Sequence, residues 1–146
     1  MYSPNLNFRK LQKSDYHKNY IQLLSQLTTT GNISENEFSK IFNNLGNNTH
    51  IYVYEDVQAQ KIIASATLIL EQKFIHNGGI VAHLEDVVVD SNSRGFRIGQ
   101  KLIQKIINIA KENNCYKIIA DCKSSLIPFY EKNNFQKKGE QIAIYF

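Results

Sequence analysis

The stretch that decides the fold is Leu84–Ile103, LEDVVVDSNSRGFRIGQKLI. It begins with a short apolar run broken by two carboxylates, Glu85 and Asp86. A polar turn with two arginines and two glycines follows over residues 90–99, and apolar residues then recur at helical spacing from Gln100 onward. A strand that passes through such a turn into a helix gathers backbone N–H groups and the positive end of a helix dipole at one point. We expect this point to bind an anion, usually a phosphate or pyrophosphate.

Length and composition predict one domain that spans residues 1–146. A hydrophobic fraction of 42% and a charged fraction of 21% are those of an ordinary soluble globular protein. No apolar run approaches the roughly 20 residues of a transmembrane helix, and the first residues, MYSPNLNFRK, lack the apolar region of a secretory signal. We therefore expect a cytoplasmic protein that does not bind a membrane.

Charge and metal-ligand spacing narrow the class of partner. The net charge of +4 is mild and is compatible with an anionic substrate or cofactor. The charge is not gathered into a basic stripe with interleaved aromatic residues, so we expect no nucleic-acid partner. Cys115 and Cys122 form no CxxC pair, and no two histidines have the spacing of a zinc-binding helix. We expect no bound metal.

Apolar periodicity and turn residues predict the element order β-α-α-β-β-β-α-β-α-β, a mixed α/β (α+β) fold with one central sheet. Ser34 with Glu37 is a capping box that marks the start of the second helix. The expected strands span residues 6–11, 51–54, 62–70, 81–89, 116–120 and 135–146. The expected helices run from Ser14 to about Thr30, from Ser34 to Gly46, from about Gly95 to Asn113, and over a short segment capped by Ser124 or Ser125.

The turn SRGFRIGQ has two interpretations. In one it cradles a diphosphate: Gly95 and Gly99 let the backbone approach a ligand, N–H groups up to Gln100 point at phosphate oxygens, and Arg94 and Arg97 add charge. In the other it is an ordinary helix N-terminus whose glycines serve only the turn. Spacing alone favours the second interpretation, because short glycine motifs are weak signals.

The element order, with an Arg-Gly turn after the fourth strand, resembles the GNAT family of N-acetyltransferases. In that family the loop R/Q-x-x-G-x-G/A binds the pyrophosphate of acetyl-CoA. Arg97 stands where the family has its first glycine, so we expect a backbone there that is not restricted to glycine. The resemblance implies acetyl-CoA as co-substrate, without a metal, bound by Val87, Val88, Val89, Arg94, Gly95, Phe96, Arg97, Ile98, Gly99, Gln100 and Tyr130.

Five further segments resemble the glucosamine-6-phosphate N-acetyltransferases within that family. The resemblance implies direct transfer of the acetyl group of acetyl-CoA to the amine of D-glucosamine 6-phosphate. The products are N-acetylglucosamine 6-phosphate and CoA, on the way to an amino-sugar nucleotide. It also implies a homodimer. The segments are Leu27–Gly31, Glu71–His76, Leu84–Val89, Cys115–Cys122 and Pro128–Phe135.

The same resemblance implies sugar contacts, and each has a plainer alternative. Glu85 and Asp86 are otherwise surface carboxylates that point to opposite faces of a strand, unless a bulge re-aims one of them. Lys73 and His76 are otherwise solvent-facing residues beside a turn. Two more residues complete the implied set: Thr28, otherwise a helix terminator, and Asp121, otherwise a helix cap.

Direct attack needs a proton acceptor and a leaving-group donor, and no Ser-His-Asp or Cys-His pairing suggests an acyl-enzyme. Glu85 or Asp121 is the candidate acceptor, and the residues leave the choice open. The resemblance makes Tyr130 the donor to the coenzyme sulfur; the alternative is a core aromatic, a place we expect Phe129 to take. A backbone N–H near Val87 is the candidate to polarise the acetyl carbonyl.

Two other functions stay open at this point. The same fold acetylates other small amines or protein amines, and a non-catalytic domain could bind CoA as a ligand. The segment 142–146, IAIYF, also lacks the arginine that members of the family often carry there to reach the sugar phosphate of a partner subunit. Either Lys73 and His76 carry more of that contact, or another basic residue replaces it.

Overall fold

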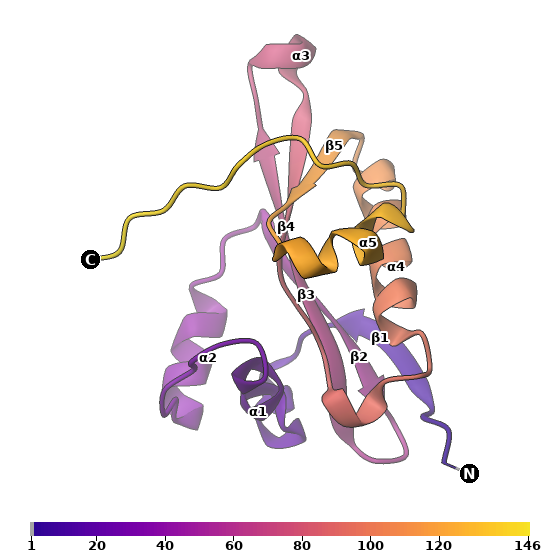
Figure 1. Cartoon of the computed structure of the whole chain (residues 1–146). Coiled ribbons are helices and arrows are strands. Elements are labelled where there is room, and N and C mark those ends of the chain that lie inside the picture. The colour runs from indigo at the N-terminus through magenta and orange to yellow at the C-terminus, as the bar shows by residue number, and fades with distance from the viewer. Residues whose placement is uncertain (1) are drawn as a thin grey trace.

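The computed structural model describes residues 2–146. One five-stranded sheet has the order β1-β2-β3-β4-β5, and Figure 1 shows its long strands as the spine of the molecule. The first four strands pair antiparallel and β5 pairs parallel to β4, which confirms the mixed sheet. The strands are β1 (Leu6–Lys10), β2 (Thr49–Asp56), β3 (Lys61–Gln72), β4 (Ile80–Val89) and β5 (Cys115–Ala120).

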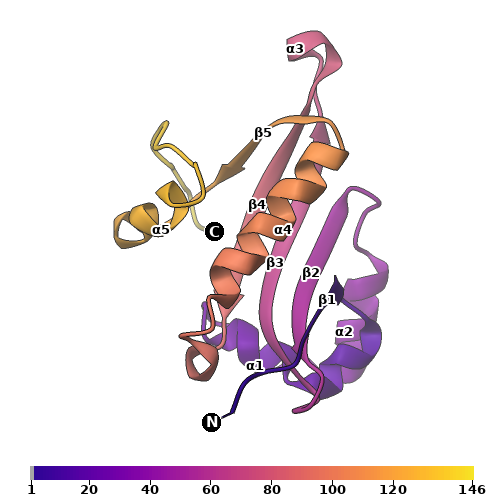
Figure 2. The same cartoon turned by 90° about the vertical axis from the view of Figure 1, so that its right-hand side faces the viewer.

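Helices cover both faces of the sheet. Figures 1 and 2 show α1 (Tyr20–Ser25) and α2 (Glu35–Asn43) on one face, and α4 (Ile98–Glu112) on the other. The one-turn helix α3 (Ile75–Gly78) closes the β3–β4 hairpin, which projects beyond the sheet, and α5 (Ile127–Glu131) follows β5. No helix within residues 2–146 combines the length and the apolarity that a bilayer crossing requires.

Two apolar layers hold these helices to the sheet. On the α4 side, Leu102, Ile103 and Ile106 are fully buried against alternate residues of β3 and β4. On the other side, Leu23 of α1 and Phe38 of α2 cover a second cluster. Alternation along the strands sends one set of side chains to each layer, and register shifts in the β2–β3 and β3–β4 pairs change the layer of the residues beyond them. The strand residues are Ala64, Ala66, Leu68, Ala82 and Leu84 in the first layer, and Val53, Ile62 and Val88 in the second.

The capping box of the second helix is confirmed. The Ser34 hydroxyl accepts a hydrogen bond from the Glu37 N–H at 3.2 Å, and the Glu37 carboxylate accepts one from the Ser34 N–H at 2.7 Å. The cap predicted at Ser14 is wrong. A 3-10 turn over Lys13–Lys18 starts after Gln12, and α1 follows only from Tyr20.

Asp15 causes that difference at the first helix. Its side chain is fully buried, accepts two hydrogen bonds from the Arg9 guanidinium at 2.7 and 2.8 Å, and accepts the Gln12 N–H at 2.8 Å. A buried carboxylate with these partners ties the turn to β1, so tertiary contacts override the local signal. The cap predicted at Ser124 or Ser125 is also wrong, because a 3-10 turn over Ser124–Leu126 follows Lys123 without a side-chain cap.

The last predicted strand, 135–146, is wrong for the single chain. This segment has no regular secondary structure and extends away from the sheet, as the yellow trace in Figure 1 shows. A strand needs a neighbouring strand to pair with, and none of the described residues lies in register with it. Its large apolar side chains are consequently exposed: Ile142, Ile144, Tyr145 and Phe146.

Candidate active site

The parallel strands β4 and β5 separate along their length. Their pairing ends at Leu84 opposite Ala120, whereas β4 continues against β3 as far as Val89. Figure 2 shows β5 turning away from β4 at this point. The edge of β4 over residues 85–89 therefore has backbone N–H and C=O groups with no strand beside them among the described residues. Such groups are ready to bond an extended ligand.

A β-bulge shapes the start of this open edge. Thr67 of β3 pairs with Glu85 and Ser65 pairs with Val88, so two residues of β4 oppose Ala66 alone. Asp86 is the extra residue and has a left-handed backbone, with φ of 51°. The bulge shifts the alternation: Leu84 and Val87 both pack with the α4 layer, and Asp86 lines a pocket under α1 and α2. Glu85 and Asp86 therefore lie on the same side of the sheet, which strict alternation would not allow.

Glu85 lies among other carboxylates. Partial burial raises its pKa, and the nearby charges of Asp121 and Asp86 raise it further, while His83 lowers it. A carboxyl group with a raised pKa is a stronger base once ionised, which suits proton transfer near neutral pH. Asp121 follows β5, is exposed, and accepts a hydrogen bond from Gln141 at 3.0 Å. The structure thus brings the three predicted carboxylates to one region. Glu85 differs from the other two because it is partly buried, whereas Asp86 and Asp121 are exposed.

The Arg-Gly turn leads directly into α4. Arg97 is the N-cap residue of α4, and among the described residues no side chain makes a capping hydrogen bond to the first turn. The first helical hydrogen bond runs from the Lys101 N–H to the Arg97 carbonyl at 3.0 Å. The N–H groups of the first turn, residues 98–100, therefore remain free. Arg94 and Arg97 are exposed and make no ion pair with any described residue. This geometry suits a di-anion at a helix N-terminus.

The two glycines of the turn serve different purposes. Gly95 serves the backbone conformation: its φ of 95° is one that residues with a side chain rarely adopt, although a Cβ there would meet nothing within 4 Å. Gly99 packs closely: a Cβ there would lie 3.3 Å from the Phe129 ring and 3.5 Å from a Val89 methyl. Glycine at 99 therefore lets α4 sit against α5 and β4. Contact of Gly99 with a ligand stays a prediction.

Tyr130 lies at the other side of the opening, on α5. It is buried, packs edge-on against Phe129 at 5.1 Å and Phe135 at 5.5 Å between ring centroids, and is more buried than Phe129. The expectation that Phe129 takes the core place is thus corrected, since both rings join the α4 layer. Burial raises the pKa of the Tyr130 hydroxyl and the nearby Cys122 adds to the shift, so this hydroxyl keeps its proton at neutral pH.

Tyr130 also lines a groove of about 440 Å³ along β5. Asp121 and Cys122 form part of its wall, and the extended segment after α5 closes its far side. The groove is polar on this far side and apolar along the strand. Cys115 and Cys122 are both free thiols.

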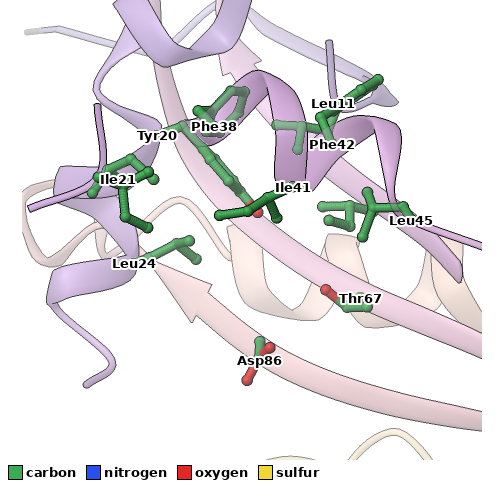
Figure 3. Close-up of a pocket in the computed structure, with 12 residues that line it drawn as sticks. Leu11, Tyr20, Ile21, Leu24, Phe38, Ile41, Phe42, Leu45, Thr67 and Asp86 are labelled. Atoms are coloured by element: carbon green, nitrogen blue, oxygen red, sulfur yellow. The ribbon is translucent and has the colours of Figure 1, made fainter. Parts of the chain in front are cut away.

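A second, smaller pocket of about 170 Å³ lies between the sheet and the helices α1 and α2. Figure 3 shows Asp86 and Thr67 on the strands, across from apolar side chains of the two helices. The lining is almost entirely apolar, so the pocket offers few hydrogen bonds to a sugar. Its polar groups are confined to the side formed by Asp86, Thr67 and the Tyr20 hydroxyl, which lies 3.3 Å from the Ser65 hydroxyl.

Lys73 and His76 lie elsewhere. Both are at the tip of the β3–β4 hairpin, where Lys73 pairs with Glu71 at 2.8 Å and the His76 ring stacks on Tyr116 at 4.2 Å between centroids. Glu85 pairs with Thr67, six residues before Lys73, so strand geometry puts the tip about 20 Å away. One chain does not bring these two residues to the carboxylates.

The chain matches the acetyltransferase (GNAT) family over residues 9–135. It belongs to this family. It is 40% identical to a probable glucosamine 6-phosphate N-acetyltransferase 2 of Oryza sativa subsp. japonica, covering 97% of this chain and 89% of the relative. It is 40% identical to the glucosamine 6-phosphate N-acetyltransferase of Arabidopsis thaliana, covering 94% and 95%. A crystal structure of the Arabidopsis enzyme superimposes with a TM-score of 0.94 over 97% of this chain and 99% of that chain.

Arg97 of this GNAT acetyltransferase stands where the loop resemblance led us to expect a glycine. We expected a backbone not restricted to glycine, and the residue is left-handed, with φ of 56° and ψ of 29°. Glycine adopts this region freely, whereas a residue with a side chain occupies it at a cost. The conformation is therefore open to arginine, as expected, but a glycine would adopt it at lower cost.

We predict opposite effects on stability and ligand binding for Arg97→Gly. The free energy of unfolding rises by up to about 1 kcal/mol, because the left-handed strain disappears, while acetyl-CoA binds more weakly without the guanidinium. Arg94 is the matched control, since its φ of −67° carries no such strain. Arg94→Gly lowers the affinity without the gain in stability. Urea denaturation and calorimetric titration measure the two effects, and a loss of stability in Arg97→Gly would contradict the prediction.

Sequence reasoning missed the residues that hold the base of the loop in this acetyltransferase. Asp90 is buried directly after β4 and accepts hydrogen bonds from Gln26 at 3.0 Å and from Lys61 at 3.3 Å. Burial raises the pKa of Asp90, but the bonds from Gln26, the Asn92 N–H and Lys61 outweigh it, and the net pKa is lowered. An Asp followed by Ser-Asn-Ser after a strand is a recognisable turn signal. No local pattern points to Gln26, whose partners are more than sixty residues away.

Within residues 2–146 no group of three or more His, Cys, Asp or Glu side chains is arranged to hold a metal ion.

Proposed function

We propose that this protein transfers the acetyl group of acetyl-CoA to the amine of D-glucosamine 6-phosphate, releasing N-acetylglucosamine 6-phosphate and CoA. The observation that carries the proposal is near-full-length similarity to enzymes of that name. The site is chemically consistent with it: a helix N-terminus with two free arginines for a pyrophosphate, an open strand edge, and grouped carboxylates for an ammonium.

In this proposal the coenzyme lies along the open edge of β4. The backbone of Val87, Val88 and Val89 bonds its extended arm, as a short added strand would. Its pyrophosphate meets the turn that leads into α4, where N–H groups are free and Arg94 and Arg97 carry unpaired charge. The turn residues in contact are Arg94, Gly95, Phe96, Arg97, Ile98, Gly99 and Gln100.

The amino sugar binds beside the carboxylates. Asp86 and Asp121 hold the ammonium and hydroxyl groups, and Thr28, exposed just after α1, adds a hydroxyl. Glu85 takes a proton from the ammonium, and the free amine attacks the thioester carbonyl carbon. As the C–N bond forms and the C–S bond breaks, the nitrogen loses its second proton to water and becomes the neutral amide nitrogen. Tyr130 donates a hydrogen bond or its proton to the departing thiolate, and the Val87 N–H bonds the carbonyl oxygen. Water also returns a proton to Tyr130 when the phenol has protonated the thiolate.

We infer that the sugar phosphate is held by a second copy of the chain. Lys73 and His76 lie about 20 Å from Glu85 along the same sheet, by strand spacing. They can reach the phosphate of a sugar bound at the carboxylates only from a partner subunit. The unpaired edge of β5 and the apolar segment Ile142–Phe146 supply a surface for such a homodimer.

The test of the proposed function is release of free thiol from acetyl-CoA in the presence of amines. We expect release with glucosamine 6-phosphate, and much less with glucosamine, with other amino-sugar phosphates, or with a lysine peptide. Turnover with another amine but not with glucosamine 6-phosphate would overturn the substrate assignment. Binding of CoA without turnover on any amine would indicate a non-catalytic domain.

We predict that Tyr130→Phe lowers kcat about tenfold and leaves the KM for both substrates nearly unchanged. The phenol would act only when the thiolate forms, and its loss therefore affects the transition state more than the ground state. The ring keeps its edge-on contacts with Phe129 and Phe135. The matched control is Tyr2→Phe, whose exposed ring lies outside the proposed site and the proposed dimer surface. Steady-state kinetics at saturating acetyl-CoA decide the matter, and equal rates for both variants would remove Tyr130 from the reaction.

A further inference from the structure

The end of α1 is joined to the coenzyme loop through the side-chain amide of Gln26. The amide N–H donates to the Asp90 carboxylate at 3.0 Å, and the amide oxygen accepts the Ser91 N–H at 2.9 Å. The orientation of the amide is fixed, because a carboxylate only accepts and a backbone N–H only donates. Figures 1 and 2 show α1 beside the turn that precedes α4.

The loop side of this bridge is anchored to β3 at one residue, Asp90. Asp90 is buried, its N–H donates to the Ile63 carbonyl at 2.8 Å, and Lys61 donates to its carboxylate at 3.3 Å. The Ser93 hydroxyl lies within 3.5 Å of the same carboxylate. β3 therefore anchors the loop at Asp90 alone. Ser91, which donates to Gln26, is exposed and begins the part of the loop that carries the free arginines and leads to the N–H groups of α4.

The helix side of the bridge leads directly into the acceptor region. Gln26 is the C-terminal cap of α1, and its N–H donates to the Leu23 carbonyl at 3.1 Å. Thr28 comes two residues later, in the exposed connection to α2, and its N–H still bonds the Leu24 carbonyl at 3.3 Å. Within the described residues, Gln26 is the side chain whose hydrogen bonds join this connection to the loop after β4.

We propose that Gln26 is a positioning residue that couples the two substrates: order imposed on the Asp90–Arg97 loop by the coenzyme is transmitted to the Thr28 segment, and the reverse. Gln26 touches neither substrate. The inference rests on the proposed function, because it takes the Thr28 segment as part of the acceptor site. Coupling of this kind is reciprocal, so each ligand raises the affinity for the other by the same factor.

The experiment titrates CoA into the protein with and without saturating glucosamine 6-phosphate, a pair that cannot react. We expect the sugar to tighten CoA binding at least about fivefold in the unaltered protein, and by less than about twofold in Gln26→Ala. A merely structural loss would weaken CoA equally with and without sugar and would leave the ratio of the two dissociation constants intact. Gln22→Ala is the matched control: the same residue type on the same helix, exposed, and without a bond to the loop.

A second variant pair tests the bridge itself. Gln26→Glu places a carboxylate against Asp90 and removes coupling, whereas the double variant Gln26→Glu/Asp90→Asn restores a donor opposite an acceptor and recovers part of it. An unchanged ratio in Gln26→Ala, or a ratio of one in the unaltered protein that binds both ligands, overturns the inference and leaves the proposed function standing. Absence of sugar binding to the unaltered protein overturns the proposed function, and this inference with it.

Discussion

Glu85→Gln lowers kcat at least about 100-fold, the usual contribution of a positioned general base, while the KM for acetyl-CoA stays within about twofold. Glutamine keeps the shape and the hydrogen-bonding reach of the side chain but cannot take a proton from the sugar ammonium. The coenzyme meets the backbone of β4 and the Arg-Gly turn, so its binding does not depend on this carboxylate. Thiol-release kinetics at saturating glucosamine 6-phosphate measure the change.

The same variant is expected to be more stable at neutral pH. Burial and the charges of Asp121 and Asp86 raise the pKa of Glu85 above its ordinary value. A carboxyl group with a raised pKa in the folded state favours its neutral form, so its favourable contribution is present at low pH and is lost as the pH rises through that pKa. A neutral amide removes this penalty. Higher thermal stability together with low activity would exclude unfolding as the cause of the lost rate.

The pH profile distinguishes Glu85 from Asp121. Activity that depends on ionised Glu85 falls as the pH drops through its raised pKa, and this acidic limb disappears from the residual activity of Glu85→Gln. Asp121→Asn is the comparison: its carboxylate is exposed and already bonded by Gln141, so we expect a smaller loss, chiefly in the KM for the sugar. A larger fall in kcat for Asp121→Asn than for Glu85→Gln would make Asp121 the proton acceptor and Glu85 the sugar-binding residue.

The parts of the fold that depend on neighbouring residues in the sequence were predicted correctly. The three central strands, the capping box at Ser34 and the strand–turn–helix around residues 84–103 follow from alternation, turn residues and helix caps. The carboxylates that the family resemblance implied also come together, Glu85 and Asp86 at the bulge of β4 and Asp121 after β5. A bulge was named only as the one arrangement that would re-aim Glu85 or Asp86. Nothing in the residues LEDVVV shows that Asp86 is the extra residue.

What sequence reasoning missed depends on distant partners. Asp15 displaces the expected cap at Ser14 because Arg9 and Gln12 bind it. Gln26 finds Asp90 only after folding. Lys73 and His76 resemble the family's sugar-phosphate segment, yet a single chain leaves them at the hairpin tip. In the proposed dimer these two residues would meet the carboxylates only across the subunit boundary, so one chain could not bring them together.

Removal of Ile142–Phe146 converts the proposed dimer to a monomer and lowers activity at least about tenfold, because the sugar phosphate loses its contacts from the partner. In one chain these apolar side chains are almost fully exposed, and so is the free edge of β5, where Ile119 faces solvent. Burial is worth about 2 kcal/mol for each such side chain, and the β-rich segment suits pairing with an edge strand of a second copy. Sedimentation velocity measures the change of mass.

Point variants keep the chain length while testing the same surface. Ile144→Asp is expected to weaken the dimer as the deletion does, and Lys138→Asp, in the same extended segment but outside the apolar stretch, is the control that leaves it intact. A monomeric unaltered protein with full activity would contradict both the dimer and the shared site.

Mixed subunits test whether one site draws on two chains. Lys73→Ala and Glu85→Gln are each expected to be nearly inactive alone. A dimer with one subunit of each kind has one site in which Glu85 of the first chain meets Lys73 of the second, so random pairing restores about a quarter of the sites. Co-refolding the two variants in equal amounts and measuring thiol release decides it. No recovery, in a mixture shown to contain mixed dimers, would mean that Lys73 and Glu85 serve the reaction from one chain or not at all.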